Sequence, residues 1–447
     1  MANDYLDYFT INGVEVNIQD YGRDQPNGVP VLDAQGKLPT KYIPDNYADK
    51  LLVSPKDPYK DDFVTWVGKL VSPELKHSGE SWTQGTGDNT TYNMQQPVRA
   101  NGLWVCGSAK HGIWWSKDGM SWTQGTGANT TYNMWKPVYA NGLWVCGSGG
   151  GGIWWSEDGK SWTQGTGDNT TYNLPQLVHA NGLWVCGSYS HGIWWSEDGK
   201  SWTQGTGIPF NYDISTSPAY ANGLWVCGCR SHGIWWSEDG KSWTQGTGAN
   251  TTYSMLLPVH ANGLWVCGSN GHGIWWSKDG MSWTQGTGAN TTYSMGQPVH
   301  ANGLWVCGSG GGGIWWSEDG KSWTQGTGDN TTYNMEQPVH ANGLWVCGSA
   351  KHGIWWSEDG KSWTQGTGAN TAYTMKALVY DNESWVCGSS SHGIWWSKDG
   401  KTWTQGTGEN TAYTMQYLAY ANGLWVCGSD GYGMWWSGVP VYLPEVS

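Results

Sequence analysis

Arginine, phenylalanine and long apolar runs are what this 447-residue chain has least of. Only three arginines are present, Arg23, Arg99 and Arg230, and the formal net charge is −13 at pH 7. A chain without a basic stripe has nothing with which to neutralise phosphates, so we expect no nucleic-acid partner. No apolar run approaches the ~18 residues that a membrane-spanning helix needs, so we expect no membrane insertion.

The N-terminus also lacks the features of a secretory signal. Residues 1–7 contain two acidic residues and no basic segment followed by an apolar one. We therefore expect synthesis in the cytoplasm without a signal peptide. An extracellular role needs another exit from the cell, such as lysis.

Disulfide bonds are a further expected absence, although ten cysteines are present. Nine of them recur at intervals of about 40 residues, from Cys106 to Cys427. Equivalent positions on neighbouring repeats should lie farther apart than the ~4.4–6.8 Å between Cα atoms that a disulfide allows. We interpret these nine as small buried residues in a strand, and the tenth, Cys229, as an exposed thiol in a loop.

Tryptophan and glycine are abundant instead, with 38 Trp and 68 Gly against only 3 Phe. The Trp residues follow a repeat whose centre reads Gly-Ile-Trp-Trp-Ser-Glu-Asp-Gly-Lys-Ser-Trp-Thr-Gln at 152–164. Two short strands, Ile153 to Ser156 and Ser161 to Gln164, flank its Asp-Gly turn, and a second hairpin signal, Asn141-Gly142, lies upstream. Because Trp recurs with the repeat, core packing is the expected role of most of these residues.

Each repeat contains four predicted strands. In the first repeat they are Gln96 to Ala100, Leu103 to Gly107, Ile113 to Ser116 and Ser121 to Gln124. Repeats of ~40–50 residues with four short strands are typical of a β-propeller that has one blade per repeat. A linear solenoid is the alternative.

The two ends of the repeat array favour a closed ring. The array begins with a lone fourth strand, Ser81 to Gln84, and ends with three strands that finish at Met434 to Ser437. Pairing these ends removes both sheet edges, whereas a solenoid needs polar caps that the sequence lacks. We therefore predict an all-β fold: a nine-bladed β-propeller of four-stranded blades over residues 76–447, preceded by a small extended and β-stranded arm over residues 1–75.

The arm carries one hairpin signal, Phe9 to Ile18, and too little apolar material for a core of its own. Its segment from Leu32 to Pro44, Leu-Asp-Ala-Gln-Gly-Lys-Leu-Pro-Thr-Lys-Tyr-Ile-Pro, resembles a motif common in phage tail-fibre and baseplate-attached proteins. The resemblance implies attachment to other tail or baseplate proteins through residues 1–75. We also expect a homo-oligomer, with a trimer favoured.

The Ser-x-Asp-Gly-x-Ser-Trp turns, such as Ser156 to Trp162, are similar to the Asp-box of sialidase-like and tectonin-type lectin-like propellers. Their spacing is one residue shorter than usual, so the match is to a variant. Eight repeats carry the turn, from Ser116 to Ser397. The resemblance implies a structural role, in which the Asp accepts backbone N–H bonds and the Trp packs between blades.

Differences among the near-identical repeats concentrate in two places: the loop between the second and third strands, and the pair of residues entering the first strand. In an antiparallel blade both lie on one face, opposite the constant Asn-Gly and Asp-Gly turns. That pattern is expected of a recognition surface on a rigid frame, and drift at tolerant loop positions is the alternative. The candidate ligand-binding residues are therefore Gln95, Gln96, Lys110, His111, Trp135, Lys136, Tyr189, His191, Arg230, His232, Asn270, His272, Glu336, Lys351, His352, His392, Tyr417 and Tyr432.

Six of these candidates are histidines, one in each of six repeats. A zinc ion needs ligands at ~2.1 Å, which single histidines spaced around a wide ring do not offer. A hydrogen-bonding role is therefore favoured for these histidines, and no metal or other cofactor is expected.

Three functions fit a propeller of this kind. The first, favoured by the arm, is a phage tail-fibre or receptor-binding protein that recognises a host cell-surface glycan or protein through several weak sites. The second is a free-standing lectin-like propeller for adhesion or defence. The third, a glycan depolymerase or sialidase-like hydrolase, needs an Arg cluster and paired carboxylates that the repeats do not supply, so we expect no enzyme.

Overall fold

The computed structural model describes residues 8–11, 14–17, 79–214, 216–368 and 371–438. In the arm, β1 (Tyr8–Ile11) and β2 (Val14–Asn17) pair antiparallel, so the predicted hairpin is confirmed with both ends one residue earlier. The rest of the arm, including the segment from Leu32 to Pro44 and its expected attachment and oligomerisation, lies outside the described residues.

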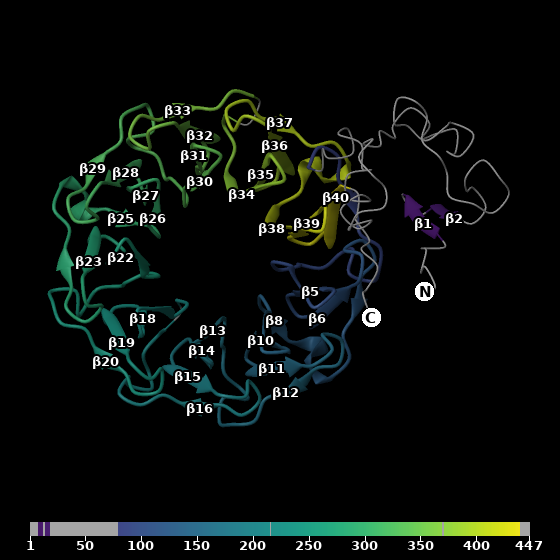
Figure 1. The fold of residues 1–447 in the computed structure, drawn as a ribbon, viewed down its shortest axis with the longest axis horizontal. Coiled ribbons are helices and arrows are strands. Elements are labelled where there is room, and N and C mark those ends of the chain that lie inside the picture. The colour runs from purple at the N-terminus through teal and green to yellow at the C-terminus, as the bar shows by residue number, and fades with distance from the viewer. Residues whose placement is uncertain (1–7, 12–13, 18–78, 215, 369–370, 439–447) are drawn as a thin grey trace, which may run out of the picture. The chain divides into compact units, whose positions relative to one another are not determined.

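Nine antiparallel sheets follow in the described residues, and they form the blades of a ring (Figure 1). Each has the four strands of a propeller blade, and two of them gain a fifth short strand, β8 or β25. We number the blades 1 to 9 in chain order. Their first strands are β4 (Val98–Ala100), β9 (Val138–Ala140), β13 (Gln176–Ala180), β17 (Ala219–Ala221), β21 (Val259–Ala261), β26 (Val299–Ala301), β30 (Val339–Ala341), β34 (Met375–Asp381) and β38 (Met415–Ala421). Their second strands are β5 (Leu103–Gly107), β10 (Leu143–Gly149), β14 (Leu183–Gly187), β18 (Leu224–Gly228), β22 (Leu264–Gly268), β27 (Leu304–Gly310), β31 (Leu344–Gly348), β35 (Ser384–Ser389) and β39 (Leu424–Ser429).

The outer half of each blade is equally regular. The third strands are β6 (Ile113–Ser116), β11 (Ile153–Ser156), β15 (Ile193–Ser196), β19 (Ile234–Ser237), β23 (Ile274–Ser277), β28 (Ile314–Ser317), β32 (Ile354–Ser357), β36 (Ile394–Ser397) and β40 (Met434–Gly438). The fourth strands are β7 (Thr123–Gln124), β12 (Thr163–Gln164), β16 (Thr203–Gln204), β20 (Thr244–Gln245), β24 (Thr284–Gln285), β29 (Thr324–Gln325), β33 (Thr364–Gln365), β37 (Thr404–Gln405) and, for blade 9, β3 (Thr83–Gln84). Short extra elements precede some first strands: β8 (Asn133–Met134), β25 (Ser294–Met295) and the 3-10 helices η4 (Ala128–Thr131), η5 (Ala289–Thr292) and η6 (Glu409–Ala412). The predicted nine-bladed propeller is confirmed.

The first strand of most blades is shorter than predicted, and proline is the reason. Blade 1 was expected to begin its first strand at Gln96, but β4 begins at Val98 because Pro97 has no N–H for the ladder. Blades 3, 8 and 9 carry Leu177, Leu378 and Leu418 at this position, and their first strands extend over 5, 7 and 7 residues.

The fourth strands are also shorter than predicted, because their first residues pair with the neighbouring blade. Ser121 was expected to open β7, which begins instead at Thr123. Ser121 forms a parallel bridge with Thr86, and the Trp122 N–H donates to the Thr86 carbonyl at 2.9 Å. The same bridge recurs around the ring, from Thr126 with Ser161 to Thr367 with Thr402, and joins consecutive blades.

The ring is closed by strands from the two ends of the repeat array. Strand β3 pairs antiparallel with β40, with Thr83 opposite Trp436 and Gln84 opposite Trp435. The Gly85 N–H extends this ladder by donating to the Met434 carbonyl at 2.7 Å. The predicted closure is confirmed, and it leaves no blade with an unpaired third strand.

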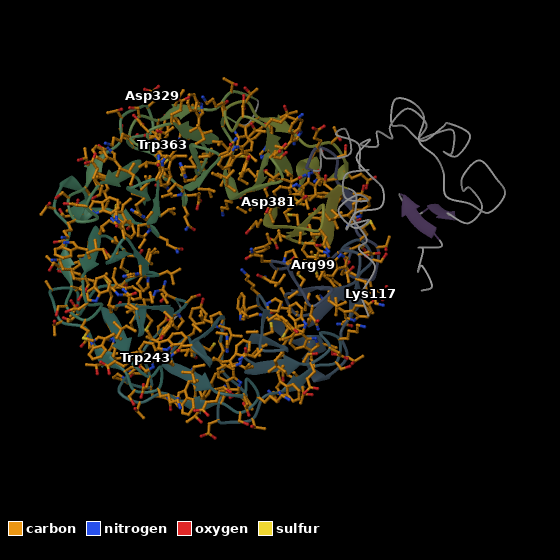
Figure 2. All side chains as sticks on the ribbon, viewed as in Figure 1. Arg99, Lys117, Trp243, Asp329, Trp363 and Asp381 are labelled. Carbon is orange, nitrogen blue, oxygen red and sulfur yellow. The ribbon has the colours of Figure 1, made fainter. Side chains whose placement is uncertain are left out.

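The hydrophobic core is divided into clusters that each span two blades. In one of them, Leu103, Val105 and Ile113 of blade 1 pack against Trp144 and Cys146 of blade 2, together with Trp154 and Trp162. Each buried Trp removes ~150–250 Å² from water, worth about 4–6 kcal/mol at ~25 cal/mol per Å² before ordering entropy is subtracted. Tryptophan packing between blades therefore holds the ring together, and Figure 2 shows the side chains filling the ring of blades around an open middle.

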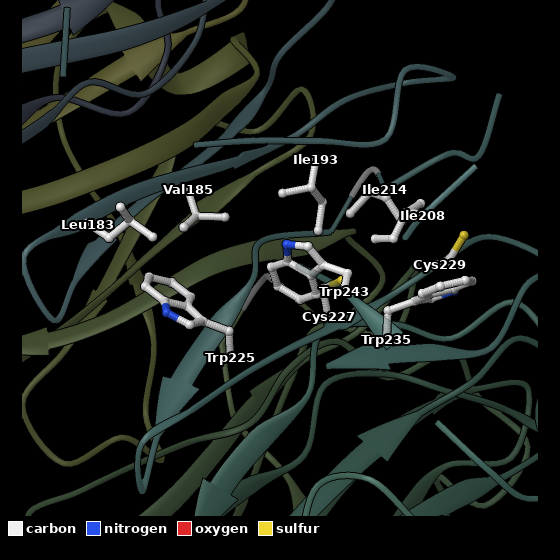
Figure 3. Close-up of a cluster of buried hydrophobic side chains, with 10 residues drawn as sticks. All are labelled: Leu183, Val185, Ile193, Ile208, Ile214, Trp225, Cys227, Cys229, Trp235 and Trp243. Atoms are coloured by element: carbon white, nitrogen blue, oxygen red, sulfur yellow. The ribbon is translucent and has the colours of Figure 1, made fainter. Parts of the chain in front are cut away.

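All ten cysteines are described, all are buried, and none forms a disulfide bond. The nine repeated cysteines thus occupy the role that was predicted for them. The prediction that Cys229 is an exposed thiol is wrong: it is fully buried in the cluster between blades 3 and 4, which also contains Ile214, Trp235 and Trp243 (Figure 3). Burial, with a further contribution from Asp213, raises the pKa of the Cys229 thiol to about 12. The equivalent Ser108 and Ser148 are buried as well, because this position lies beneath the loop that enters the first strand.

The Asp-Gly turns are held by a recurring set of hydrogen bonds. Asp158 Oδ1 accepts from the backbone N–H groups of Lys160 (2.8 Å) and Ser161 (2.7 Å) and from the Ser156 hydroxyl (2.9 Å). Partial burial raises the pKa of the Asp158 carboxyl, but these hydrogen bonds outweigh it, so the pKa lies below its ordinary value of 3.8. In the other hairpin turn, Asn141 and Gly142 both have positive φ, 51° and 76°, as a two-residue type I′ turn requires.

Acid should weaken the ring through these turns. Because folding lowers the pKa of seven such carboxyls, their stabilisation is complete above the ordinary value and is lost as the pH falls through the lower folded-state values. The carboxyls are those of Asp158, Asp198, Asp239, Asp279, Asp319, Asp359 and Asp399. We expect the urea midpoint to drop steeply below about pH 4, and to drop less in a variant with Asn at all seven positions, which keeps an acceptor oxygen without a charge. An equal acid loss in both proteins would contradict this account.

Within the described ranges, no helix has the length and apolar character needed to cross a membrane.

Candidate functional site

The loops that vary among the repeats meet on one face of the ring. In blade 1, the Ala109 N–H of the loop between the second and third strands donates to the Asn93 carbonyl at 2.9 Å. Asn93 belongs to the loop that leads into the first strand. We call this side the variable face. The side that carries the Asn-Gly and Asp-Gly turns is the turn face.

The six candidate histidines are half-buried and stack on tyrosines of the variable face. His111 lies on Tyr92 with 3.5 Å between ring centroids and 3° between ring planes. The His111 carbonyl accepts hydrogen bonds from the Trp114 indole (3.0 Å) and the Gln124 amide (2.8 Å). The other stacked pairs are Tyr172 with His191, Tyr212 with His232, Tyr253 with His272, Tyr333 with His352 and Tyr373 with His392. One ring face of each histidine is therefore used within the protein.

In the blades without a histidine at this position, a different residue lies against the repeated tyrosine. In blade 9, Tyr432 stacks on Tyr413 at 3.6 Å, and its side chain is 41% exposed. In blades 2 and 6, Gly151 and Gly312 take the histidine position, and a Cβ there would meet the ring of Tyr132 or Tyr293 at 2.8 Å. The repeated tyrosine thus needs either a stacking ring or bare backbone beneath it.

The candidates that enter the first strands lie next to the innermost strands of the blades, which Figure 1 shows at the inside of the ring. Lys136 and Glu336 are exposed, whereas Trp135 and Tyr417 are half-buried, as are Gln95 and Gln96. Although the Glu336 side chain is exposed, the protein around it partly desolvates its carboxyl and raises the pKa, with Lys376 acting in the opposite direction. Burial and Asp430 raise the pKa of the Tyr417 hydroxyl.

The candidates in the loops between second and third strands point to solvent to different degrees. Lys110 and Lys351 are exposed and have positive φ, 65° and 68°. Asn270 and Arg230 are exposed as well, and Tyr189 is 36% exposed. The structure therefore brings all the candidates to one face, but it spreads them over eight blades.

The boundary between blades 3 and 4 breaks this regularity. Phe210, in the loop that leads into blade 4, is 48% exposed and meets the His191 ring edge to face at 4.8 Å. It also lies 5.9 Å from the Tyr172 ring. Together with the exposed Tyr189 of the same blade 3 loop, these rings form what we call the aromatic patch: Tyr172, Tyr189, His191 and Phe210.

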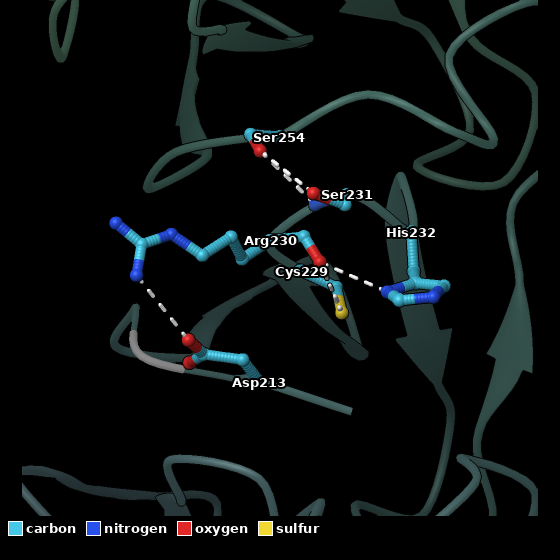
Figure 4. Close-up of polar contacts among 6 residues, drawn as sticks. All are labelled: Asp213, Cys229, Arg230, Ser231, His232 and Ser254. Atoms are coloured by element: carbon cyan, nitrogen blue, oxygen red, sulfur yellow. Dashed lines mark hydrogen bonds and ion pairs between the residues drawn. The ribbon is translucent and has the colours of Figure 1, made fainter. Parts of the chain in front are cut away.

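Charged and hydroxyl groups lie on the blade 4 side of this loop. Arg230 Nη1 is 3.6 Å from Asp213 Oδ2, and the Arg230 N–H donates to the Asp213 carbonyl at 3.0 Å (Figure 4). The Ser231 N–H donates to Ser254 Oγ at 3.1 Å, and His232 Nδ1 lies 2.9 Å from the Arg230 carbonyl. Asp213 Oδ1 is buried without a hydrogen-bond partner.

Sequence reasoning included Tyr189, His191, Arg230 and His232 but missed Phe210 and Asp213. The signal was present, because Ile208-Pro209-Phe210 replaces an Asp-, Ala- or Glu-Asn-Thr sequence found in the other repeats, in a loop that is otherwise nearly constant.

The two arginines of the repeats lie in different blades. Arg99, toward the inside of the ring in Figure 2, donates to the Lys117 carbonyl at 3.1 Å, whereas Arg230 lies in blade 4. Over the described part of the chain, no group of three or more His, Cys, Asp or Glu side chains is placed to hold a metal ion.

Comparisons with known proteins support the fold alone. No protein-family model and no curated protein matches this chain. Among solved structures, the computationally designed Ika8 protein is similar over 80% of this chain and 100% of its own, at 12% identity and a TM-score of 0.52. BamB from Moraxella catarrhalis matches over 81% and 99%, at 9% identity and 0.50, and the Dos1 propeller over 83% and 97%, at 8% identity and 0.52. Identities this low show a shared β-propeller architecture.

Proposed function

We propose that this protein is a receptor-binding protein of a phage tail fibre or related particle, and that its variable face recognises a ligand on the host cell surface, a glycan foremost. The observation that carries the proposal is the contrast between a nearly constant scaffold and an exposed aromatic patch at one blade boundary. A binding role is compatible with the propeller fold, which presents loops on a rigid frame.

The chemistry of the patch supports a sugar as the ligand. Sugar rings offer apolar faces that stack on aromatic side chains, and Phe210 and Tyr189 are two of the three large hydrophobic side chains exposed on the described residues. Hydroxyl groups at the sugar edge need donors and acceptors, which Arg230, Asp213 and Ser231 supply beside the patch.

The arm and the turns supply the remaining parts of the proposal. Residues 1–75 attach the ring to a tail or baseplate and join copies of the chain, a trimer being favoured, as the resemblance of the segment from Leu32 to Pro44 implies. The Asp-box-like turns act in the scaffold only, because Asp158 Oδ1 is occupied by three hydrogen bonds of its own turn. The protein catalyses no reaction in this proposal and needs no cofactor.

A glycan array probed with the full-length protein, followed by an assay for sugar release, tests the proposal. We expect binding to a restricted set of glycans and no released product. Released oligosaccharide would favour a hydrolase, and the absence of binding to both glycans and whole host cells would overturn the proposal. A lectin-like propeller without a particle would bind equally well but would not associate with tail proteins through residues 1–75.

A further inference from the structure

Two hollows between blades lie on the turn face, on the side away from the aromatic patch. One, of about 570 Å³, lies between blades 7 and 8 and is lined by Asn342, Leu344 and Glu358 of blade 7 and by Trp385, Asp399 and Lys401 of blade 8. The other, of about 480 Å³, lies between blades 3 and 4 and is lined by the equivalent residues. Because equivalent residues line a hollow at two boundaries, the hollow is a property of the repeat and not of one particular loop.

Each hollow is lined by the indole of a second-strand tryptophan, Trp385 in one and Trp225 in the other. Trp385 and its equivalents lie on the second strand, and a Cβ on Gly400 of the neighbouring turn would sit 3.0 Å from Trp385 Nε1. The indole nitrogens of Trp225 and Trp385, whose residues are each 1% exposed, donate no hydrogen bond within the described structure. The equivalent nitrogens of Trp144 and Trp425, at boundaries 1–2 and 8–9, are fully enclosed and also lack a hydrogen-bond partner. By contrast, the fourth-strand Trp162 donates its indole N–H to the Gly159 carbonyl. A buried N–H without an acceptor is costly, so an oxygen atom supplied by a ligand would be favourable there.

The charges of the hollow select against anions. Lys401 Nζ pairs with Glu358 of the preceding blade at 2.6 Å and lies 4.2 Å from the centre of the Trp356 ring. Asp399 adds a second carboxylate, whose Oδ1 is held by its own turn. The lysine is therefore already neutralised and the hollow has a net negative charge, so a phosphate or carboxylate ligand would be repelled. A neutral polyol suits it, since its hydroxyls donate to the carboxylates and accept from the indole and the ammonium.

Only some boundaries carry the complete set of groups. The Glu–Lys pair is present at boundaries 2–3, 3–4, 6–7 and 7–8, as Glu157–Lys200, Glu197–Lys241, Glu318–Lys361 and Glu358–Lys401. Boundary 5–6 has Lys278 in place of the glutamate, and boundary 4–5 has Met281 in place of the lysine. The complete boundaries form two neighbouring pairs around blades 3 and 7, which lie on opposite sides of the ring (Figure 1).

We propose that these four boundaries are binding sites for one neutral sugar ring each, on the turn face and separate from the aromatic patch. The inference does not rest on the proposed function, because it uses none of the residues of the variable face. Four weak sites in two pairs would give a polysaccharide avidity that no single hollow supplies.

Indole N–H resonances of the full-length protein, labelled with ¹⁵N at tryptophan, report on the sites directly. Substituting Trp by Phe at one second-strand position at a time assigns each resonance, because Phe keeps a ring but has no N–H. Titration with galactose, glucose and N-acetylglucosamine at millimolar concentrations should shift the resonances of Trp184, Trp225, Trp345 and Trp385. The resonances of Trp265 and Trp305, at the incomplete boundaries 4–5 and 5–6, should not move.

A charge exchange between two boundaries sharpens the test. Glu358→Lys should weaken the sugar-induced shift at Trp385 by at least about tenfold in affinity, since it removes an acceptor and adds a second ammonium. Lys278→Glu should create a fifth responsive resonance, that of Trp305. Both side chains occur naturally at this repeat position, so folding is not at risk.

Several outcomes would overturn the inference: no shift with any neutral sugar, equal shifts at complete and incomplete boundaries, or a response confined to the anionic N-acetylneuraminic acid. Tyr189→Ala should leave the four shifts unchanged. If that variant loses cell binding while the shifts persist, both proposals stand. If the unsubstituted protein binds neither host cells nor any arrayed glycan but still shows the four shifts, only the proposed function falls.

Discussion

Replacing Tyr189 and Phe210 together by alanine should weaken binding to the recognised glycan or cell by at least about a hundredfold while leaving unfolding unchanged. The two side chains are 36% and 48% exposed, so their removal opens no cavity in the core. Each exposed ring offers a stacking surface worth roughly 1–2 kcal/mol to a sugar, and two such losses multiply to about two orders of magnitude. Surface plasmon resonance against the best array glycan, with urea unfolding in parallel, measures both quantities.

A matched control for this variant comes from the turn face. Asp158→Ala removes an acceptor of three hydrogen bonds and should cost about 1–2 kcal/mol of stability without changing glycan affinity. Trp135→Ala is a less clean probe than Tyr189→Ala, because Trp135 is half-buried and its Nε1 is enclosed by protein. If the patch variant and Asp158→Ala lost binding and stability alike, the assignment of recognition to the variable face would be wrong.

A disulfide across the ring closure should stabilise the protein by about 6 kcal/mol, the chain-entropy value for a loop of about 350 residues. Thr83 and Trp436 are direct partners in the β3–β40 ladder, which places their Cα atoms within disulfide range in the double variant Thr83→Cys, Trp436→Cys. The native cysteines are buried and form no disulfide bonds, so they should not compete for the new thiols. Urea unfolding of the oxidised and reduced forms of the same variant gives the gain.

The same cross-link inside one blade isolates the effect of closure. Trp155 and Thr163 are partners in the β11–β12 ladder with the same local pairing, but the loop that they enclose is only about nine residues long. The chain-entropy value for that loop is about 2.5 kcal/mol, so the closure disulfide should exceed it by roughly 3 kcal/mol. Equal gains from the two disulfides would mean that the array opens elsewhere before its ends separate.

The fold was predictable because residues close together in the sequence specify the turns and strands of each repeat. Asn141-Gly142 specifies a type I′ turn, and Asp158-Gly159 closes the next hairpin with bonds of its own side chain. Leftover strands at the two ends of the array then specify a ring, since only their pairing removes the last edges. Strand ends were less predictable, because Ser121 and Trp122 pair with the neighbouring blade, a partner that no local pattern reveals.

The sites were only partly predictable. Comparison of the repeats located the loops that vary, but it predicted Cys229 to be exposed because this residue replaces a loop serine of the other repeats. Cys229 belongs instead to a buried cluster with Ile214 and Trp235, which come from other segments of the chain at the boundary between blades 3 and 4. The sequence likewise could not predict that Trp225 and Trp385 line hollows, because the residues around each indole come from two different repeats.

By itself, the sequence determined the strand order, the turn types, the number of blades and the closure of the ring, since each of these depends on residues close together in one repeat or on the two ends of the array. Only the tertiary structure decided which side chains share a boundary: the aromatic patch between blades 3 and 4, and the hollows where Glu of one blade meets Lys and Trp of the next. The physical reason is that a repeat specifies its own backbone through local hydrogen bonds, whereas a surface between blades is composed by two repeats and exists only after they pack.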